Sequence, residues 1–231
     1  MSDRRQATPE RIGAEKLAYW YFRLNGFLQI ENFYVHPRSH GGARTDADLL
    51  GVRFPHRQER LYDNPADIMA DDVAGLDLTG DSVDVVIAEV KLGRCALNGP
   101  WTDPARENLN RVLAAVGCMP QDRIGTAAKA VYEHGYVEDG PSLRVRLVAV
   151  GSERCPEIAG RYPRVTQICW ADLLRFIYSR FRLYRHQKSD TQHWDRTGNL
   201  LKRKVTTSSM TEEAFVTWAL SALNPAPGKF R

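Results

Sequence analysis

The sequence of 231 residues contains only four cysteines, and none of them has the spacing of a zinc-ligand pair. Cys95, Cys118, Cys155 and Cys169 form no Cys-x-x-Cys motif, so a structural zinc site is not expected. A disulfide framework would suit a smaller secreted chain. Reduced thiols in a cytoplasmic protein are therefore the simplest interpretation.

Several other patterns are also missing from the sequence. Segment 1–13 has no apolar stretch typical of a signal peptide, and no uninterrupted apolar run reaches membrane-spanning length, so no membrane partner is expected. There is no glycine-rich phosphate loop, so an ATP-driven function is not supported, and there is no G-x-S-x-G motif. With 43% hydrophobic and 26% charged residues, the composition predicts one well-buried core.

The pattern of apolar residues predicts the element order of an α/β protein. Predicted helices cover 9–25, 104–116, 125–134, 171–184 and 212–223, with Thr8 and Thr211 as N-caps of the first and last. Predicted strands cover 27–34, 45–54, 83–91, 143–150 and 165–169. This order predicts a central mixed β-sheet flanked by helices.

Two segments are predicted to lack regular structure over most of their length. Residues 56–81 are rich in aspartate and are interpreted as a solvated surface excursion. Residues 186–209 are also expected to be irregular. We therefore predict one domain over 1–185 and a C-terminal extension over 186–231 that contains a single helix.

The clearest strand, 83–91, ends in Glu89-Val90-Lys91. Side chains alternate along a strand, so Glu89 and Lys91 point to the same face, at the edge of an apolar layer where an unpaired charge would be costly. A carboxylate there can bind a hard cation beside an ammonium group that orients a water. The alternative is an ordinary ion pair at the end of a surface strand.

Two aspartates begin the strand predicted over 45–54. Aspartate is a poor strand former, yet Asp46 and Asp48 precede an apolar run and share one face. A carboxylate at this position could meet Glu89 across the sheet and complete a magnesium site, because a cation relieves the repulsion between two carboxylates. The alternative is a turn leading into the strand.

Glu15 lies on an apolar flank of the first predicted helix, where a buried carboxylate would need a partner. The alternative is partial exposure in the first turn, where the helix dipole favours an acid.

Six motifs follow one another along the sequence: Gly13-x-Glu15, an apolar helix, Gly26-Phe27, Asn32, Asp46-x-Asp48-Leu-Leu-Gly and Ala88-Glu-Val-Lys91. Motifs in this order resemble those of the PD-(D/E)XK nuclease superfamily. The segment is most similar to the resolvase-like and Mrr-like branches, over roughly residues 9 to 117. The sequence departs from the family pattern in a long acidic insert after Asp48. No glutamine closely follows Lys91, although Asn98 and Asn108 could substitute for it.

The resemblance implies a restriction-endonuclease-like fold and Mg²⁺-dependent hydrolysis of phosphodiester bonds, with Mn²⁺ able to substitute. It implies that Asp48 and Glu89 ligate the metal, assisted by the Val90 carbonyl. Lys91 would position the attacking water, and Glu15 would help to hold the metal or its water. Asp46 is the alternative to Asp48.

The segment between Arg175 and Lys204 is basic. It contains nine lysines and arginines, which are opposed by two aspartates. Basic side chains neutralise phosphates and interleaved aromatic rings can stack on bases. The alternative is an amphipathic helix with a solvated arginine face. The residues that we expect to contact nucleic acid are Arg182, Arg185, Lys202, Arg203 and Lys204.

Three functions remain open from the sequence. The first is an active nuclease, with DNA as the favoured substrate. The second is a catalytically weak or inactive nucleic-acid-binding subunit of a defence or repair complex. The third is a protein-interaction module that docks through the acidic segment 56–81. A homodimer is also left open.

Overall fold

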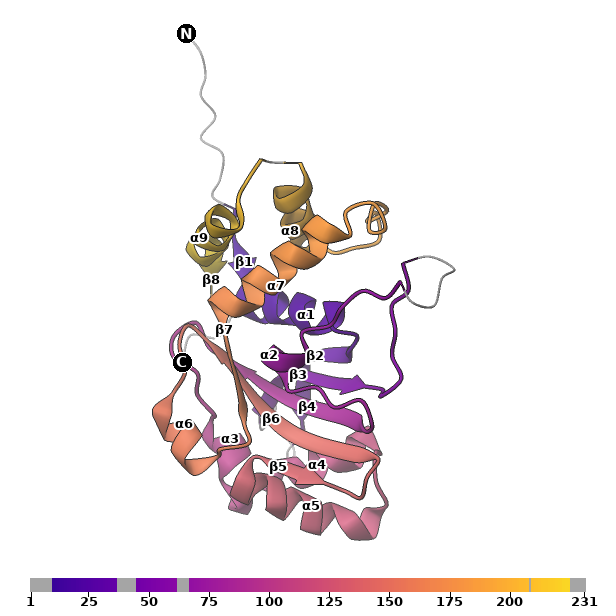
Figure 1. Ribbon diagram of the computed structural model, residues 1–231. Helices are drawn as coiled ribbons and strands as arrows, with labels where there is room; N and C mark the ends of the chain where they lie inside the picture. The colour runs from indigo at the N-terminus through magenta and orange to yellow at the C-terminus, as the bar shows by residue number, and fades with distance from the viewer. Residues whose placement is uncertain (1–9, 37–44, 62–66, 208, 225–231) are drawn as a thin grey trace.

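The computed structural model describes residues 10–36, 45–61, 67–207 and 209–224. They form a six-stranded mixed β-sheet with helices on both faces (Figure 1). The predicted α/β class and helix-flanked mixed sheet are therefore confirmed. No helix in these residues is long and apolar enough to cross a membrane.

The strands of the sheet are β2 (Leu28–Val35), β3 (Thr45–Arg53), β4 (Val83–Val90), β5 (Tyr136–Glu138), β6 (Leu143–Gly151) and β7 (Thr166–Cys169). They follow the order β2-β3-β4-β6, and both β5 and β7 pair with the remaining edge of β6. Neighbours among β2, β3 and β4 are antiparallel, whereas β6 runs parallel to β4 and β7. All strands except β5 were predicted.

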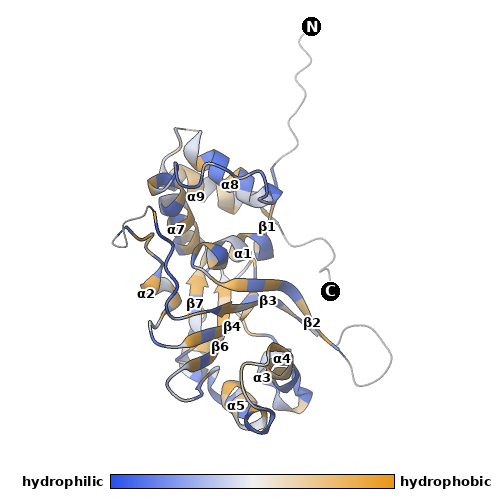
Figure 2. Ribbon diagram, turned by 90° about the vertical axis from the view of Figure 1, so that its right-hand side faces the viewer, coloured by the Kyte–Doolittle hydropathy of each residue, from blue (hydrophilic) through white to orange (hydrophobic). Residues whose placement is uncertain are grey.

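The helices divide between the two faces of the sheet (Figures 1 and 2). One face carries α1 (Ala14–Leu24), α7 (Trp170–Leu183), α8 (Arg196–Thr206) and α9 (Glu212–Ala222), with the single turn α2 (Val73–Leu76) nearby. The other carries α3 (Gly99–Thr102), the 3₁₀ turn η1 (Pro104–Arg106), α4 (Asn108–Val116), α5 (Gln121–His134) and α6 (Pro156–Arg161).

Strand β4 separates two hydrophobic cores. Val86, Ala88 and Val90 face the core of α1, α7, α8 and α9, whereas Val85 and Ile87 face the core of α4 and α5. Because side chains alternate along a strand, an uninterrupted apolar run indicates burial on both faces. The β-branched sequence of β4 is therefore explained by its central position.

The first helix begins later than predicted. Residues 10–13 are not helical, and α1 starts at Ala14 with Gly13 as its N-cap. Ile12 and Gly13 instead form β1, which pairs in parallel with β8 (Leu223–Asn224). The predicted start at residue 9 is therefore wrong, because a pairing with the far end of the chain holds these residues extended. Thr8 lies outside the described residues.

The C-terminal segment contains two helices, so the prediction of a single helix there is wrong. Helix α8 lies in the segment expected to be irregular, and Asp195 caps it by accepting a hydrogen bond from the Gly198 N–H at 2.9 Å. Trp20 Nε1 donates to the same Asp195 oxygen at 3.0 Å. A Cβ atom at Gly198 would lie 1.9 Å from the Trp20 ring, so glycine permits the close contact between α8 and α1.

Residues 104–116 do not form one helix. Glu107 adopts a left-handed conformation, with φ of 53°, and separates η1 from α4. The helix predicted over 125–134 is longer and begins at Gln121. Such boundaries depend on backbone conformations at single residues, which the apolar pattern does not indicate.

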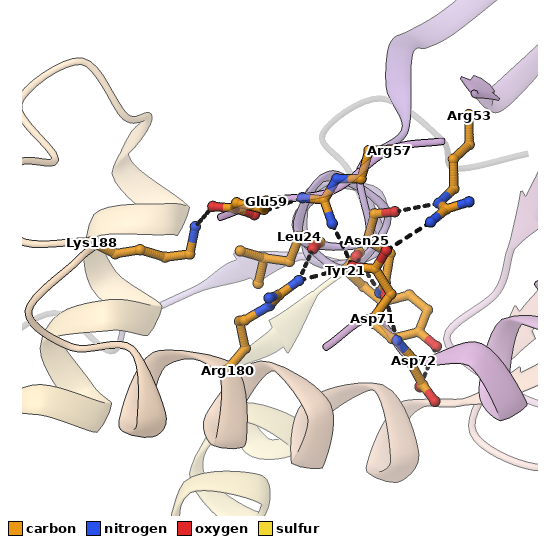
Figure 3. Close-up of polar contacts among 10 residues, drawn as sticks. All are labelled: Tyr21, Leu24, Asn25, Arg53, Arg57, Glu59, Asp71, Asp72, Arg180 and Lys188. Carbon is orange, nitrogen blue, oxygen red and sulfur yellow. Dashed lines mark hydrogen bonds and ion pairs between the residues drawn. The ribbon is translucent and has the colours of Figure 1, made fainter. Parts of the chain in front are cut away.

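In the described part of the acidic segment 56–81, Asp71 is held against the helices rather than solvated, which corrects the prediction at this residue. Its nearly buried carboxylate accepts hydrogen bonds from Arg53 at 2.8 Å, from Arg57, and from Arg180 of α7 at 3.0 Å (Figure 3). Arg180 also donates to the Leu24 carbonyl at the end of α1, at 2.6 Å. The segment is therefore tied to both α1 and α7.

A second buried ion cluster joins β4 to β6. The Asp84 carboxylate accepts hydrogen bonds from Arg144 at 2.7 and 3.1 Å and from Arg146 at 2.8 and 3.0 Å. All three side chains are buried. Burial alone would raise the pKa of Asp84, but the hydrogen bonds and charges of Arg146 and Arg144 outweigh it and hold the pKa below its usual value.

Replacing Asp84 should destabilise the fold strongly. Asp84→Asn leaves two buried guanidinium groups without their carboxylate, and breaking one side of a buried ion pair costs about 3–5 kcal/mol. We expect a loss of this size in the free energy of unfolding measured by urea denaturation. The exposed Asp81, changed to Asn, serves as the control with an effect within about 0.5 kcal/mol. A loss below about 1 kcal/mol for Asp84→Asn would contradict the interpretation.

The same cluster predicts a pH dependence. Because the folded-state pKa of Asp84 is lowered, its contribution is fully present above the unfolded-state pKa of about 3.9 and is lost as the pH falls through the folded-state pKa. The difference in unfolding free energy between the wild type and Asp84→Asn should stay constant at neutral pH and shrink in acid. A difference that does not change into strong acid argues against this ion cluster.

Candidate functional site

Asp48 and Glu89 lie side by side where the pairing of β3 with β4 ends. In the antiparallel pairing of β3 with β4, Leu49 is opposite Ala88, so the next residues outward are Asp48 and Glu89. Each has only 3% of its surface exposed. Asp48 Oδ2 accepts a hydrogen bond from the Val90 N–H at 2.7 Å, which fixes this carboxylate against β4. The structure therefore brings these two predicted site residues together.

Glu89 is surrounded by hydrogen-bond donors. Its Oε2 accepts a hydrogen bond from Trp101 Nε1 at 2.8 Å. Its Oε1 accepts hydrogen bonds from Lys91 and Asn98. Lys91 is thus on the same side of β4 as Glu89, as predicted, and its side chain is 31% exposed. The ammonium group links the buried carboxylate to the solvent.

The single turn α3 supplies two of these donors. Asn98 is its N-cap residue, and Pro100 in the first turn suits a helix start. The main-chain N–H of Trp101 donates a hydrogen bond to the Asn98 carbonyl at 2.9 Å. The sequence prediction placed only a loop here and missed Trp101. A tryptophan following Asn-Gly-Pro, within a polar segment, was the available signal.

The two candidate substitutes for a family glutamine differ in position. Asn98 contacts Glu89, whereas the Asn108 side-chain amide donates to the Pro100 carbonyl at 3.1 Å. Asn108 therefore supports the backbone of α3.

The electrostatics of the site are dominated by its two buried carboxylates. Burial, and to a smaller extent the charge of the nearby Asp48, raise the pKa of Glu89 to about 7, because Lys91 and Trp101 only partly oppose the shift. Two carboxylates are thus buried side by side, and that of Glu89 is paired with Lys91. A divalent cation would relieve the repulsion between them.

The residues fit a hard cation that keeps several waters. Mg²⁺ is commonly held by one or two carboxylates plus water, and Asp48 and Glu89 supply two such oxygen ligands. In the described part of the chain, no three His, Cys, Asp or Glu side chains gather to hold a metal ion. The predicted contribution of Glu15, half-buried in the first turn of α1, is therefore not shown. The contact seen for Val90 is made by its N–H.

Asp46 lies two residues before Asp48 and is only half-buried. It pairs in register with Tyr34 on the edge strand β2. The buried position next to Glu89 belongs to Asp48, which makes Asp48 the better candidate ligand.

The predicted basic surface is smaller than the sequence indicated. Arg180 is buried against Asp71, and Lys188 bonds to Glu59. Of the residues proposed to contact nucleic acid, the exposed ones are Arg182, Arg185 and Arg203. The half-buried ones are Lys202 and Lys204.

Glu10 neutralises part of the remaining basic surface. It is paired with Lys204 at 2.6 Å and with Arg203 at 3.4 Å. Lys202 instead donates to the Ser189 carbonyl at 3.2 Å.

The basic residues stand apart from the carboxylate pair. Trp170, the first residue of α7, donates to the Lys91 carbonyl at 3.0 Å. Arg182 lies twelve residues further along α7, or roughly 18 Å at a rise of about 1.5 Å per residue. A ligand that contacts both regions would have to span this distance.

Removing the charge of Asp48 should stabilise the cation-free protein. Asp48→Asn keeps an oxygen for the Val90 N–H while it removes the repulsion between buried carboxylates, so we expect a gain on the order of 1 kcal/mol at pH 8 in EDTA. Adding Mg²⁺ should stabilise the wild type and leave this variant unchanged. Unfolding free energies measured by urea denaturation provide both comparisons.

Asp46→Asn is the matched control, because Asp46 lies on the same strand but two residues further from the part of β3 that pairs with β4. It should respond to Mg²⁺ as the wild type does. If the stabilisation by Mg²⁺ is lost in Asp46→Asn but kept in Asp48→Asn, Asp46 rather than Asp48 is the ligand.

Comparisons with known proteins identify no relative. Known protein families, curated sequences and solved structures gave no significant match. The chemistry of Asp48, Glu89 and Lys91 must therefore be argued from their own geometry.

Proposed function

We propose that the protein is a Mg²⁺-dependent nuclease that hydrolyses phosphodiester bonds, with DNA as the favoured substrate and Mn²⁺ as an effective substitute. The observation that carries this proposal is the pair of buried carboxylates, Asp48 and Glu89, joined to the partly exposed Lys91. Burying two acids side by side is unfavourable unless a cation or a proton offsets their charge. A cation held at this position could activate a phosphodiester and a water molecule for hydrolysis.

Each residue has a role that its position supports. Asp48 and Glu89 would hold the cation, which supplies Lewis-acid activation of the phosphate and of a water molecule. Lys91 reaches solvent from beside Glu89, so its ammonium can orient the attacking water and stabilise negative charge on the phosphate. The hydrogen bond from Val90 keeps Asp48 in place throughout.

The arrangement of the sheet supports a restriction-endonuclease-like fold as part of the proposal. Helix α1 precedes the antiparallel strands β2, β3 and β4, and β6 then adds in parallel to β4. Helices α4 and α5 connect β4 to β6 across the opposite face from α1. The candidate residues lie on the two central antiparallel strands of this unit.

Nucleic acid is the partner that we propose for the basic residues. Arg182 and Arg185 are exposed at the end of α7, where they can contact phosphates. A nucleic acid that contacts both these arginines and the carboxylate pair would have to extend along the length of α7. The expected role of Arg203 and Lys204 is weaker because Glu10 already binds them.

One observation favours an alternative, a nucleic-acid-binding subunit that cleaves weakly or not at all. Both oxygens of Glu89 already accept hydrogen bonds from Lys91, Asn98 and Trp101. Such a network can stabilise the strand end without a cation. Activity measurements distinguish this alternative from the nuclease.

The decisive variant is Lys91→Ala. Purified protein is incubated with linear, supercoiled and single-stranded DNA, with Mg²⁺, with Mn²⁺ and with EDTA. We expect cleavage that requires the cation and falls by about 10²–10⁴-fold in Lys91→Ala, while DNA binding is retained. Lys129→Ala, on the exposed surface of α5, is the control and should cleave as the wild type does.

The other outcomes are equally informative. DNA binding by the wild type without metal-dependent cleavage of any substrate supports the inactive subunit. Equal cleavage by Lys91→Ala and the wild type excludes the proposed site. Failure to bind any nucleic acid at low salt contradicts both functions.

A further inference from the structure

We propose that Trp101 and Asn98 are positioning residues that leave Glu89 with one open acceptor position, on Oε2, and so make the site selective for Mg²⁺ over Ca²⁺. This inference rests on the cation site of the proposed function and does not depend on cleavage. It assigns a role to the turn α3, which no part of the nuclease chemistry otherwise uses.

The open position follows from counting hydrogen bonds. An ionised carboxylate offers about four acceptor positions, two on each oxygen. Lys91 and Asn98 occupy both positions on Oε1, and Trp101 occupies one on Oε2. One position on Oε2 is left for a cation. Glu89 can therefore coordinate through a single oxygen while its present hydrogen bonds persist.

Trp101 and Lys91 differ in how easily they can move. The Trp101 ring is buried in the core shared with Leu109, Val112 and Leu113. The indole N–H of Trp101 therefore has no alternative orientation towards water. Lys91 has a long flexible side chain that is partly exposed. Coordination through both Glu89 oxygens would require Asn98 or Lys91 to leave Oε1.

This restriction distinguishes the two cations. Ca²⁺ takes six to eight oxygen ligands and often binds a carboxylate through both oxygens. Mg²⁺ requires octahedral geometry, keeps several waters and is satisfied by single oxygens from one or two carboxylates. A Glu89 fixed to one open position, with Asp48 beside it, therefore suits Mg²⁺ better than Ca²⁺.

Calorimetric titration of the DNA-free protein with Mg²⁺ and with Ca²⁺ tests the selectivity. Trp101→Phe keeps most of the ring volume and removes the hydrogen bond. Loss of such a supporting partner lowers metal affinity by about 10–100-fold, and we expect this loss for Mg²⁺ with a smaller loss for Ca²⁺. Asn98→Ala should likewise lower the ratio of the Mg²⁺ affinity to the Ca²⁺ affinity, because it leaves an acceptor position on Glu89 Oε1 free for a cation. Trp218→Phe, on α9 in the other core, is the matched control and should leave both affinities unchanged.

A second measurement works without any variant of Glu89's neighbours. The five tryptophans give distinct indole N–H signals in a ¹⁵N-labelled sample. We expect Mg²⁺ to shift the Trp101 signal, because its acceptor would bind the cation. The signal of Trp20, which donates to Asp195, should not move. Standard resonance assignment identifies the Trp101 signal.

The outcomes separate this inference from the proposed function. If neither cation binds the wild type, both are overturned. If Mg²⁺ binds but the Trp101 signal stays fixed, or Trp101→Phe and Asn98→Ala keep the wild-type ratio of affinities, the positioning role is overturned and the cation site remains. A shifted signal with a narrowed ratio supports the inference, whether or not the protein cleaves DNA.

Discussion

Strand β4 is hydrogen-bonded on both edges and covered on both faces, so each charge that it carries must be satisfied inside the protein. The strand carries two acids with opposite surroundings. Asp84 is bound by two buried arginines, Arg144 and Arg146, which more than offset its charge. Glu89, at the other end, lies beside another buried acid and has a single lysine. The first arrangement pairs one acid with two arginines, whereas the second places two acids side by side.

This contrast explains why the proposed function belongs at one end of the strand. A fold selected only for stability would not gain from burying Asp48 against Glu89, because like charges at close range repel. Proteins accept such local instability where a ligand later offsets it. Main-chain pairing of β3 with β4 up to Leu49 and Ala88 holds the backbone of the two acids side by side. A cation can then bind with little rearrangement.

The sequence indicated the strands and the main site because that information is local. The apolar run of β4 and the positions of Glu89 and Lys91 can be read within nine residues. What could not be predicted depends on residues distant in the chain. The start of α1 is set by pairing with β8, and α8 forms where Gly198 meets Trp20. Trp101 acquires its role only because α3 folds back onto β4.

The central claim is that Asp48 and Glu89 together hold a divalent cation. Anomalous diffraction from crystals soaked in Mn²⁺ tests it most directly, because the signal locates the metal without relying on activity. We predict a peak within coordination distance of Asp48 and of Glu89 Oε2. Crystals of Glu89→Ala grown in the same conditions should lose it. A wild-type map with no peak between these two carboxylates, or with manganese bound only elsewhere, would contradict the claim.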